Sequence, residues 1–174
     1  MRFRDIPQFP RAGYTTTVPW KHLLRAVTRT DPPLIMEPDY QRGHVWTEAQ
    51  QIAYVEYGLM GGESSMVITT NCPGWMGDWR GPYELVDGLQ RVTAVLRFVR
   101  NEIPAFGSLH CDFDDNLTMT GPAFTWRVCN LPTRKEVLNL YLLLNAGGVV
   151  HSAEEIARVR KLLEQEMSSN KRSL

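Results

Sequence analysis

The segment from Glu84 to Leu96 constrains the fold most, because a short apolar strand pattern changes there into a helical pattern within two residues. Leu85 and Val86 are typical of a buried strand, and the apolar residues that follow recur at helical spacing. Asp87 and Gly88 stand at the change, and we expect Asp87 to be the N-cap of the helix. The sequence therefore predicts a strand-to-helix turn at this Asp-Gly pair.

The start of such a helix is a favourable place for an anion, because its first backbone N–H groups have no partner within the helix and its dipole is positive there. Gly88 has no side chain to block close approach, and Asp87 and Arg91 leave one face of the first turn. In this interpretation Asp87 holds magnesium or orients a water, Gln90 donates to an oxygen, and Arg91 makes forked contacts with a phosphate. The alternative is an N-cap aspartate with an i,i+4 ion pair, and local chemistry does not choose between them.

Three segments of the chain together resemble one protein family. Asp-Gly-Leu-Gln-Arg at 87–91 resembles the Asp-Gly-Gln-Gln-Arg signature of the GmrSD-type restriction endonuclease N-terminal domain family. Pro38 to Thr47 resembles its Tyr-Gln-Arg…Trp segment, and Leu144 to Gly148 followed by Ser152 to Ile156 resembles its Asn-x-Gly-Gly turn into the next helix. The order of the three segments, over about residues 35–160, makes the match specific, whereas one alone would be weak.

The resemblance implies a ParB/sulfiredoxin-like fold of the α+β class, with a small mixed β-sheet surrounded by helices. We expect residues 1–174 to form a single such domain, with a polar tail from about residue 168. Members of the family bind nucleoside triphosphates, and some hydrolyse them. Such domains regulate or power a nuclease module in restriction and phage defence, which attacks modified or foreign DNA.

For this chain the resemblance implies a nucleoside triphosphate with Mg²⁺ at the helix that follows Asp87. Asp87, Gln90 and Arg91 are then the expected catalytic residues, with Asp87 also the metal ligand. The expected nucleotide-binding residues are Gly88, Arg42, Gln41, Tyr40 and Asn145.

Alternatives stand beside two of these assignments. Arg42 is expected to reach a phosphate and Tyr40 or Gln41 a base or sugar, but Tyr40 packed in a core and Arg42 paired with a surface carboxylate is the other interpretation. Asn145 either lines the pocket or caps the end of its own helix.

The chain departs from the family pattern in two ways. Leu89 replaces the first Gln of the signature, but it lines up with Val92, Leu96 and Val99 on the helical period, so we expect it to face the core. The second departure is that no HNH-type cluster of His and Asn follows residue 152, where a nuclease module would begin. Nuclease activity by this chain is therefore not expected.

Composition agrees with a globular intracellular protein. Lys plus Arg equals Asp plus Glu at 19 each, which argues against a strongly basic nucleic-acid-coating protein but leaves a local DNA-binding patch open. The three cysteines fit neither a disulfide framework nor a structural zinc site. The sequence has no signal peptide and no membrane-spanning stretch, so we expect the cytoplasm of a bacterium or of an infected cell.

The remaining elements follow from periodicity and capping signals. We expect the helix of Thr133 and Glu136 to be the buried central one, because it is apolar on nearly all sides. The expected helices begin at Trp20 behind Pro19, at the Thr47–Gln50 capping box, at the Thr133–Glu136 box and at the Ser152–Glu155 box. The expected strands are 34–36, the paired 66–70 and 83–86, and 124–128.

Two loops carry residues that could either bind a ligand or have a purely structural role. Trp75 and Trp79 in the loop 71–82 could stack on a base or a partner, but we favour tryptophans folded back over the loop itself. His110-Cys111-Asp112 and Asp114-Asp115 match no recognised metal-site spacing, so we favour solvated acidic residues there.

The sequence thus leaves two hypotheses from different classes. The first is a domain that binds a nucleoside triphosphate, with hydrolysis as a further expectation. The second is a non-catalytic interaction or decoy module that binds DNA or a defence complex, with either a host or a viral origin. Sulfiredoxin-like reductase chemistry is disfavoured, because no cysteine lies between positions 72 and 111.

Overall fold

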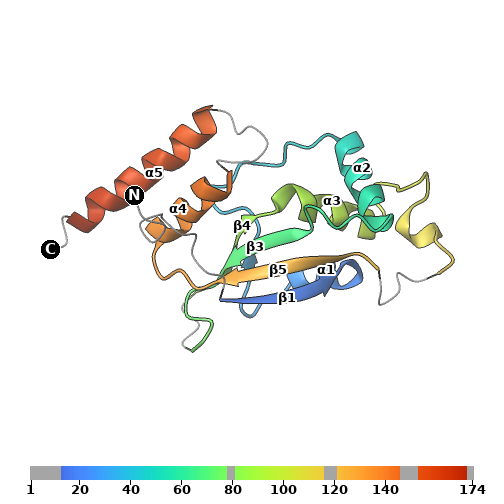
Figure 1. Ribbon diagram of the computed structural model, residues 1–174, viewed down its shortest axis with the longest axis horizontal. Coiled ribbons are helices and arrows are strands. Elements are labelled where there is room, and N and C mark those ends of the chain that lie inside the picture. Colours follow the sequence, from blue (N-terminus) through green and yellow to red (C-terminus); the bar gives the residue numbers. More distant parts are fainter. Residues whose placement is uncertain (1–12, 78–80, 116–120, 146–152, 172–174) are drawn as a thin grey trace, which may run out of the picture.

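The computed structural model describes residues 13–77, 81–115, 121–145 and 153–171, and within them one five-stranded mixed sheet carries the fold (Figure 1). The strand order is β1-β5-β3-β4-β2. The strands are β1 Tyr14–Pro19, β2 Leu34–Ile35, β3 Val67–Asn71, β4 Tyr83–Asp87 and β5 Ala123–Cys129. The helices described are α1 Trp20–Val27, α2 Glu48–Leu59, α3 Leu89–Val99, the short 3-10 helix η2 His110–Asp112, α4 Arg134–Asn145 and α5 Ala153–Lys171.

The sheet contains both parallel and antiparallel strand pairs. β3 runs parallel to β5 and antiparallel to β4, with a shift in register between Thr69 and Thr70. The edge strands are β1, antiparallel to β5, and β2, parallel to β4. The expected α+β class with a small mixed sheet is therefore confirmed, as is the predicted pairing of the strands that became β3 and β4.

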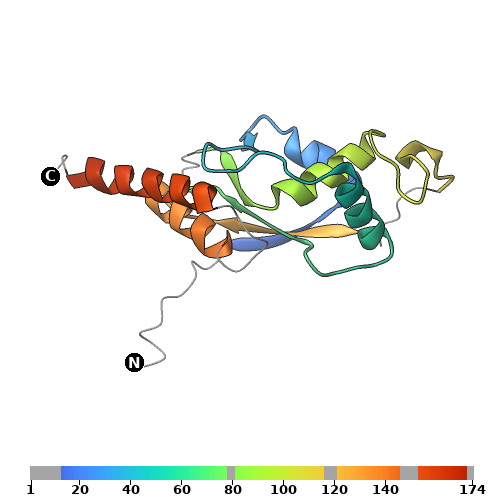
Figure 2. The same ribbon diagram turned by 90° about the horizontal axis from the view of Figure 1, so that it is seen from above.

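The main core lies between the sheet and helices α1, α2 and α3. Figure 2 shows α1 and α3 on the same side of the sheet. The fully buried side chains of this core come from all of these elements: Trp20, Leu23, Val55, Ile68, Val92, Val95, Phe98 and Phe124. Seven of the 11 residues of α3 are buried, so α3 is the helix most enclosed by the fold among those described.

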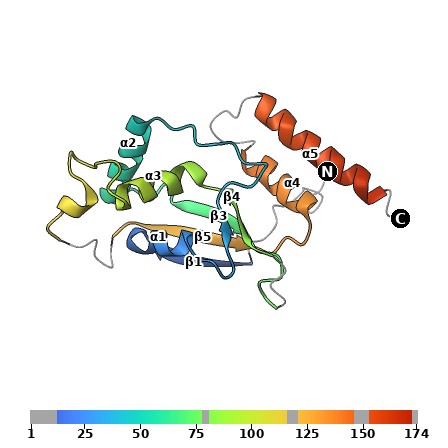
Figure 3. The same ribbon diagram turned by 180° about the vertical axis from the view of Figure 1, so that it is seen from behind.

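A second, smaller core joins α4 and α5 to β4 (Figure 1, Figure 3). The expectation that α4 is the buried central helix is wrong, since Leu143 is 46% exposed and α4 lies at the end of the sheet away from α2. The helix is apolar on more than one side because it packs against β4 on one side and α5 on another.

The starts of α2 and α4 follow the predicted capping signals. The Thr47–Gln50 capping box begins α2, and Thr133 and Glu136 make the reciprocal bonds that begin α4. Ser152 of the predicted Ser152–Glu155 box and the Gly147–Gly148 turn lie outside the described residues. α5 continues through Ser168, where we expected a tail, as far as Lys171.

The structure also bears on the loop of Trp75 and Trp79 and on the acidic loop that follows α3. Trp75 packs edge-on against Tyr14 of β1, with ring centroids 4.6 Å apart, rather than over its own loop. Trp79 lies outside the described residues. Among those that the structure describes, no group of three or more His, Cys, Asp or Glu side chains could hold a metal ion. No helix in the same part of the chain is long and apolar enough to cross a membrane.

The junction between β4 and α3 is made by a glycine. Gly88, not Asp87, is the N-cap of α3, with φ 116° and ψ 6°, and a Cβ there would lie 2.6 Å from Cγ2 of Ile68. The prediction that Asp87 caps the helix is wrong, because Asp87 is the last residue of β4 and its carboxylate turns to Arg91 instead. The turn thus requires both a left-handed backbone and the absence of a side chain.

We expect Gly88→Ala to lower the free energy of unfolding by about 2–4 kcal/mol, since the new methyl group meets Ile68 and the positive φ disfavours any side chain. Gly77→Ala is the matched control, because nothing lies within 4 Å of a Cβ at that position. Urea unfolding of both variants measures the difference. Equal stabilities of the two variants would contradict this account of the junction.

A pH-dependent stability follows from Glu84 on β4. Burial raises the pKa of its carboxyl; Arg134 opposes this and Asp39 adds to it. The folded state therefore binds the proton more tightly than the unfolded chain, so this contribution to stability is lost as the pH rises from about 4.3 through the raised pKa. Glu84→Gln should gain stability relative to the natural chain as the pH rises above about 4.3. Urea titrations should show the two proteins converging toward pH 3, and a constant difference would contradict the assignment.

Candidate functional site

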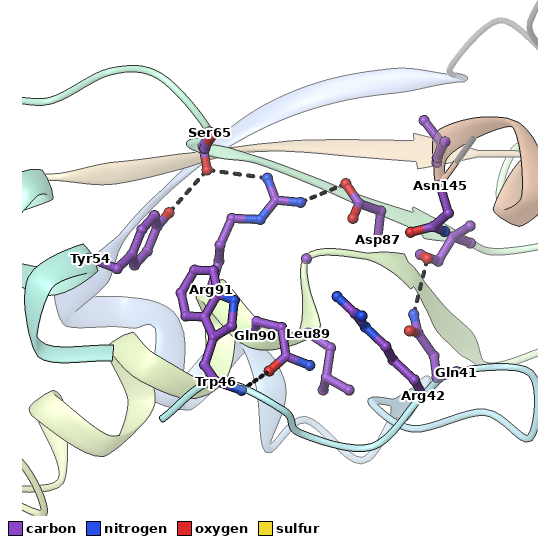
Figure 4. A pocket seen from close by; sticks show the side chains of 13 residues that line it. Gln41, Arg42, Trp46, Tyr54, Ser65, Asp87, Leu89, Gln90, Arg91 and Asn145 are labelled. Carbon is purple, nitrogen blue, oxygen red and sulfur yellow. Dashed lines mark hydrogen bonds and ion pairs between the residues drawn. The ribbon is translucent and has the colours of Figure 1, made fainter. Parts of the chain in front are cut away.

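One cleft of about 430 Å³ gathers residues from segments far apart in the sequence (Figure 4). It lies where the start of α3 meets α2, the chain between β2 and α2, and the end of α4. The lining residues are Gln41, Arg42, Trp46, Tyr54, Ser65, Val86, Asp87, Gly88, Leu89, Gln90, Arg91, Leu144 and Asn145. All three segments that carry the family resemblance contribute to this list.

Seven of the eight residues predicted to bind or act on a nucleotide line this cleft. They are Asp87, Gly88, Gln90, Arg91, Arg42, Gln41 and Asn145. The exception is Tyr40, which the fold places elsewhere. Periodicity and spacing did not predict that these segments lie close together. The family resemblance did.

Asp87 and Arg91 form an ion pair at the cleft. Nη2 of Arg91 donates to Oδ2 of Asp87 over 2.6 Å, and Nη1 donates to the carbonyl oxygens of Ser65 at 3.2 Å and Val67 at 2.6 Å. The side chain of Arg91 is only 16% exposed. Arg91 therefore ties the start of α3 to the start of β3, and its guanidinium is fixed in place.

The other carboxylate oxygen of Asp87, Oδ1, has no hydrogen-bond partner among the described residues. Asp87 is also the one carboxylate among the described residues that line the cleft. Mg²⁺ in nucleotide sites commonly takes one or two carboxylates and completes its shell with phosphate oxygens and water. The cleft therefore fits a magnesium ion brought by a phosphate ligand better than a metal held by protein groups alone.

Gln90 holds the loop before α2 in place. Its Oε1 accepts from the N–H groups of Val45 at 2.9 Å and Trp46 at 3.1 Å, and its Nε2 donates to the carbonyl of Gly43 at 3.2 Å. Only 9% of the residue is exposed. The contacts described for Gln90 are thus with backbone groups, which makes it a positioning residue for the wall of the cleft.

Gln41 has a similar role on the other side of Arg42. Its Nε2 donates to the carbonyls of Leu85 at 2.9 Å and Val86 at 3.0 Å, so it pins this segment to β4. Arg158 of α5 donates to the carbonyl of Gln41 itself at 2.8 Å. Arg42 therefore stands between two anchored positions, Gln41 and the loop held by Gln90.

Tyr40 does not line the cleft, which sets it apart from the other residues predicted to bind a nucleotide. It is 0% exposed, and its ring packs edge-on against Tyr141 of α4 with centroids 5.2 Å apart. Burial raises the pKa of its phenol, in keeping with a hydroxyl enclosed away from solvent. The packed alternative therefore holds for Tyr40, because the second core needs a large apolar ring where β4 meets α4.

Asn145 combines the two roles that we considered for it. Its Nδ2 donates to the carbonyl of Tyr141 at 2.7 Å, which satisfies a carbonyl in the last turn of α4. The residue also lines the cleft. Leu89 is 4% exposed, as expected for a residue that faces the core.

The sequence did not predict that Trp46, Tyr54 and Ser65 belong to the cleft. Trp46 packs against Tyr54, with ring centroids 5.3 Å apart. Tyr54 of α2 is half-buried and packs against the main core. The position of Trp46 within the Tyr-Gln-Arg…Trp segment was the one signal that could have found it.

Comparisons of the chain with protein-family models, with curated proteins and with solved structures gave no match. The chemistry of the cleft is therefore argued from its own geometry. That geometry consists of two arginines, one carboxylate and the start of α3, with a pair of aromatic rings beside them.

We expect Gln90→Ala to loosen the loop that carries Arg42 and Trp46, because the variant leaves the N–H groups of Val45 and Trp46 without their acceptor. Hydrogen exchange at these two amides should become faster, and unfolding free energy should fall by about 1–3 kcal/mol. The amide of Gln50, held by the Thr47 cap, is the internal control and should keep its exchange rate. Unchanged exchange at Val45 and Trp46 would contradict the positioning role.

Proposed function

We propose that this chain binds a nucleoside triphosphate with Mg²⁺ in the cleft at the start of α3. The observation that carries the proposal is the convergence of Arg42, Arg91 and Asp87 on the uncapped end of a helix. These groups come from the segments that resemble the signature of a nucleotide-binding family. The volume of about 430 Å³ falls within the range of roughly 300–1,000 Å³ usual for small-molecule sites.

The phosphates are assigned to the helix end. Gly88 lines the cleft and no side chain caps α3, so an anion gains N–H donors and the positive end of the dipole. Arg42 and Arg91 add two guanidinium groups, which suit the forked geometry of phosphate oxygens. Because Arg91 is already held by Asp87, Ser65 and Val67, it offers a fixed rather than a mobile charge.

Asp87 is assigned to the metal. Magnesium, when bound, neutralises charge on the phosphates and polarises them toward attack. Oδ1 of Asp87 is the protein ligand, while Oδ2 stays with Arg91. Hydrolysis is a second step of the proposal, in which Asp87 also orients the attacking water. Gln90 acts through the loop that it positions rather than on the substrate.

We further propose that the fold is of the ParB/sulfiredoxin-like type and that the chain is related to DNA-defence proteins. The mixed five-stranded sheet, with its strand-to-helix turn at the cleft, supports the first part. The second part rests on the three signature segments alone. The competing interpretation, an interaction or decoy module, is separated from an NTPase by turnover.

We expect isothermal titration with ATP, GTP, CTP and UTP, each with Mg²⁺, to reveal saturable binding of at least one nucleotide. Arg42→Ala should weaken it at least tenfold, because a charged hydrogen bond contributes about 1.5–3 kcal/mol and 1.4 kcal/mol is tenfold. Arg25→Ala, at an exposed position on α1, is the control and should bind as the natural chain does.

Two results would change the assignment. No binding of any of the four nucleotides by the folded protein would contradict the proposed function. Binding without release of inorganic phosphate would support the non-catalytic module over the NTPase. Thermal unfolding of each variant, measured alongside, separates loss of the site from loss of the fold.

A further inference from the structure

The cleft has an aromatic wall as well as a charged one. Trp46 and Tyr54 both line it, and their rings lie 5.3 Å apart between centroids at an interplanar angle of 58°. Both residues are half-buried and pack against the main core. Each therefore keeps part of its surface toward the cleft while the rest is supported from behind.

The two residues are held by hydrogen bonds within the protein itself. The hydroxyl of Tyr54 donates to the carbonyl of Ser65 over 3.0 Å. The backbone of Trp46 is fixed on both sides, because its N–H donates to Gln90 and its carbonyl accepts from Gln51 at 3.1 Å. A ring that is ordered before a ligand arrives loses little conformational freedom on binding, which favours affinity.

Cationic groups stand on both sides of the cleft, and the rings stand on one. Figure 4 shows Trp46 and Tyr54 on one side, with Arg91 beside them, and Arg42 with Gln41 on the other. A polyphosphate alone would use the two guanidinium groups and leave the rings without a partner. A ligand that has an anionic chain at one end and a flat π-system at the other would use both.

We propose that Trp46, backed by Tyr54, is the base-binding wall of the cleft and stacks on the aromatic base of the nucleotide. This inference rests on the proposed function, since it assigns the second half of the same site. Stacking of a base on an aromatic side chain contributes about as much as a strong hydrogen bond and accepts every base, because every base has a π-face. The cleft then distinguishes nucleotides from inorganic polyphosphates more sharply than it distinguishes one base from another.

The test compares Mg²⁺-ATP with Mg²⁺-tripolyphosphate, which has the charged chain but no base or sugar. By isothermal titration the natural chain should bind ATP at least about tenfold more tightly than tripolyphosphate. Trp46→Ala should reduce the affinity for ATP toward that for tripolyphosphate and leave the latter unchanged. Trp46→Phe, which keeps a smaller ring, should retain part of the preference, and Tyr54→Phe should retain nearly all of it.

A fluorescence measurement keeps the proposal testable if Trp46→Ala does not fold. ATP should quench tryptophan emission of the natural chain more than tripolyphosphate does, and this difference should disappear in Trp46→Phe. Equal affinities for ATP and tripolyphosphate would overturn the inference and leave the phosphate site standing. A parallel loss of both affinities in Trp46→Ala would also overturn it, as a purely structural effect. Failure of the folded natural chain to bind either ligand would instead overturn the proposed function.

Discussion

The close contact between Gly88 and Ile68 is the constraint on which the rest of the site depends. β4 ends at Asp87 and α3 begins at Leu89, so the chain turns from strand to helix at one residue that has a left-handed backbone. No other residue type fits, because a Cβ at Gly88 would meet Ile68 at 2.6 Å. This turn sends Asp87 and Arg91 to one side of the junction and the amide of Gln90 to the loop before α2.

The walls of the cleft are held by hydrogen bonds between side chains and distant backbone groups. Gln90 binds the loop around Val45, Gln41 binds β4, and Arg91 binds the start of β3. These bonds join segments that are tens of residues apart, so the shape of the cleft is a property of the folded chain. All three polar residues of the signature have partners within the protein itself: Gln90 binds backbone groups, and Arg91 binds backbone carbonyls and the carboxylate of Asp87.

Local signals in the sequence predicted local structure well. The Thr47–Gln50 box placed the start of α2, and the period of Leu89 and Val92 placed the buried face of α3. The features that the sequence did not predict depend on contacts between distant segments or lack a local signal. Strand β1 was not predicted because its middle residues are three exposed threonines without apolar alternation. Tyr40 could be assigned to the core or to the pocket only once the position of α4 was known. Asp87 does not cap α3 because its carboxylate pairs with Arg91, and Gly88 is the N-cap instead.

Nuclear magnetic resonance on the uniformly ¹⁵N-labelled protein, titrated with Mg²⁺-ATP, tests the central claim most directly because it reports both binding and its location. The account predicts that the largest amide shifts fall on Gly88 to Arg91 and on Arg42, with the indole of Trp46 shifting as well. Shifts concentrated at the small pocket beside Tyr14 and Trp126, or no shifts at saturating ATP, would contradict the account.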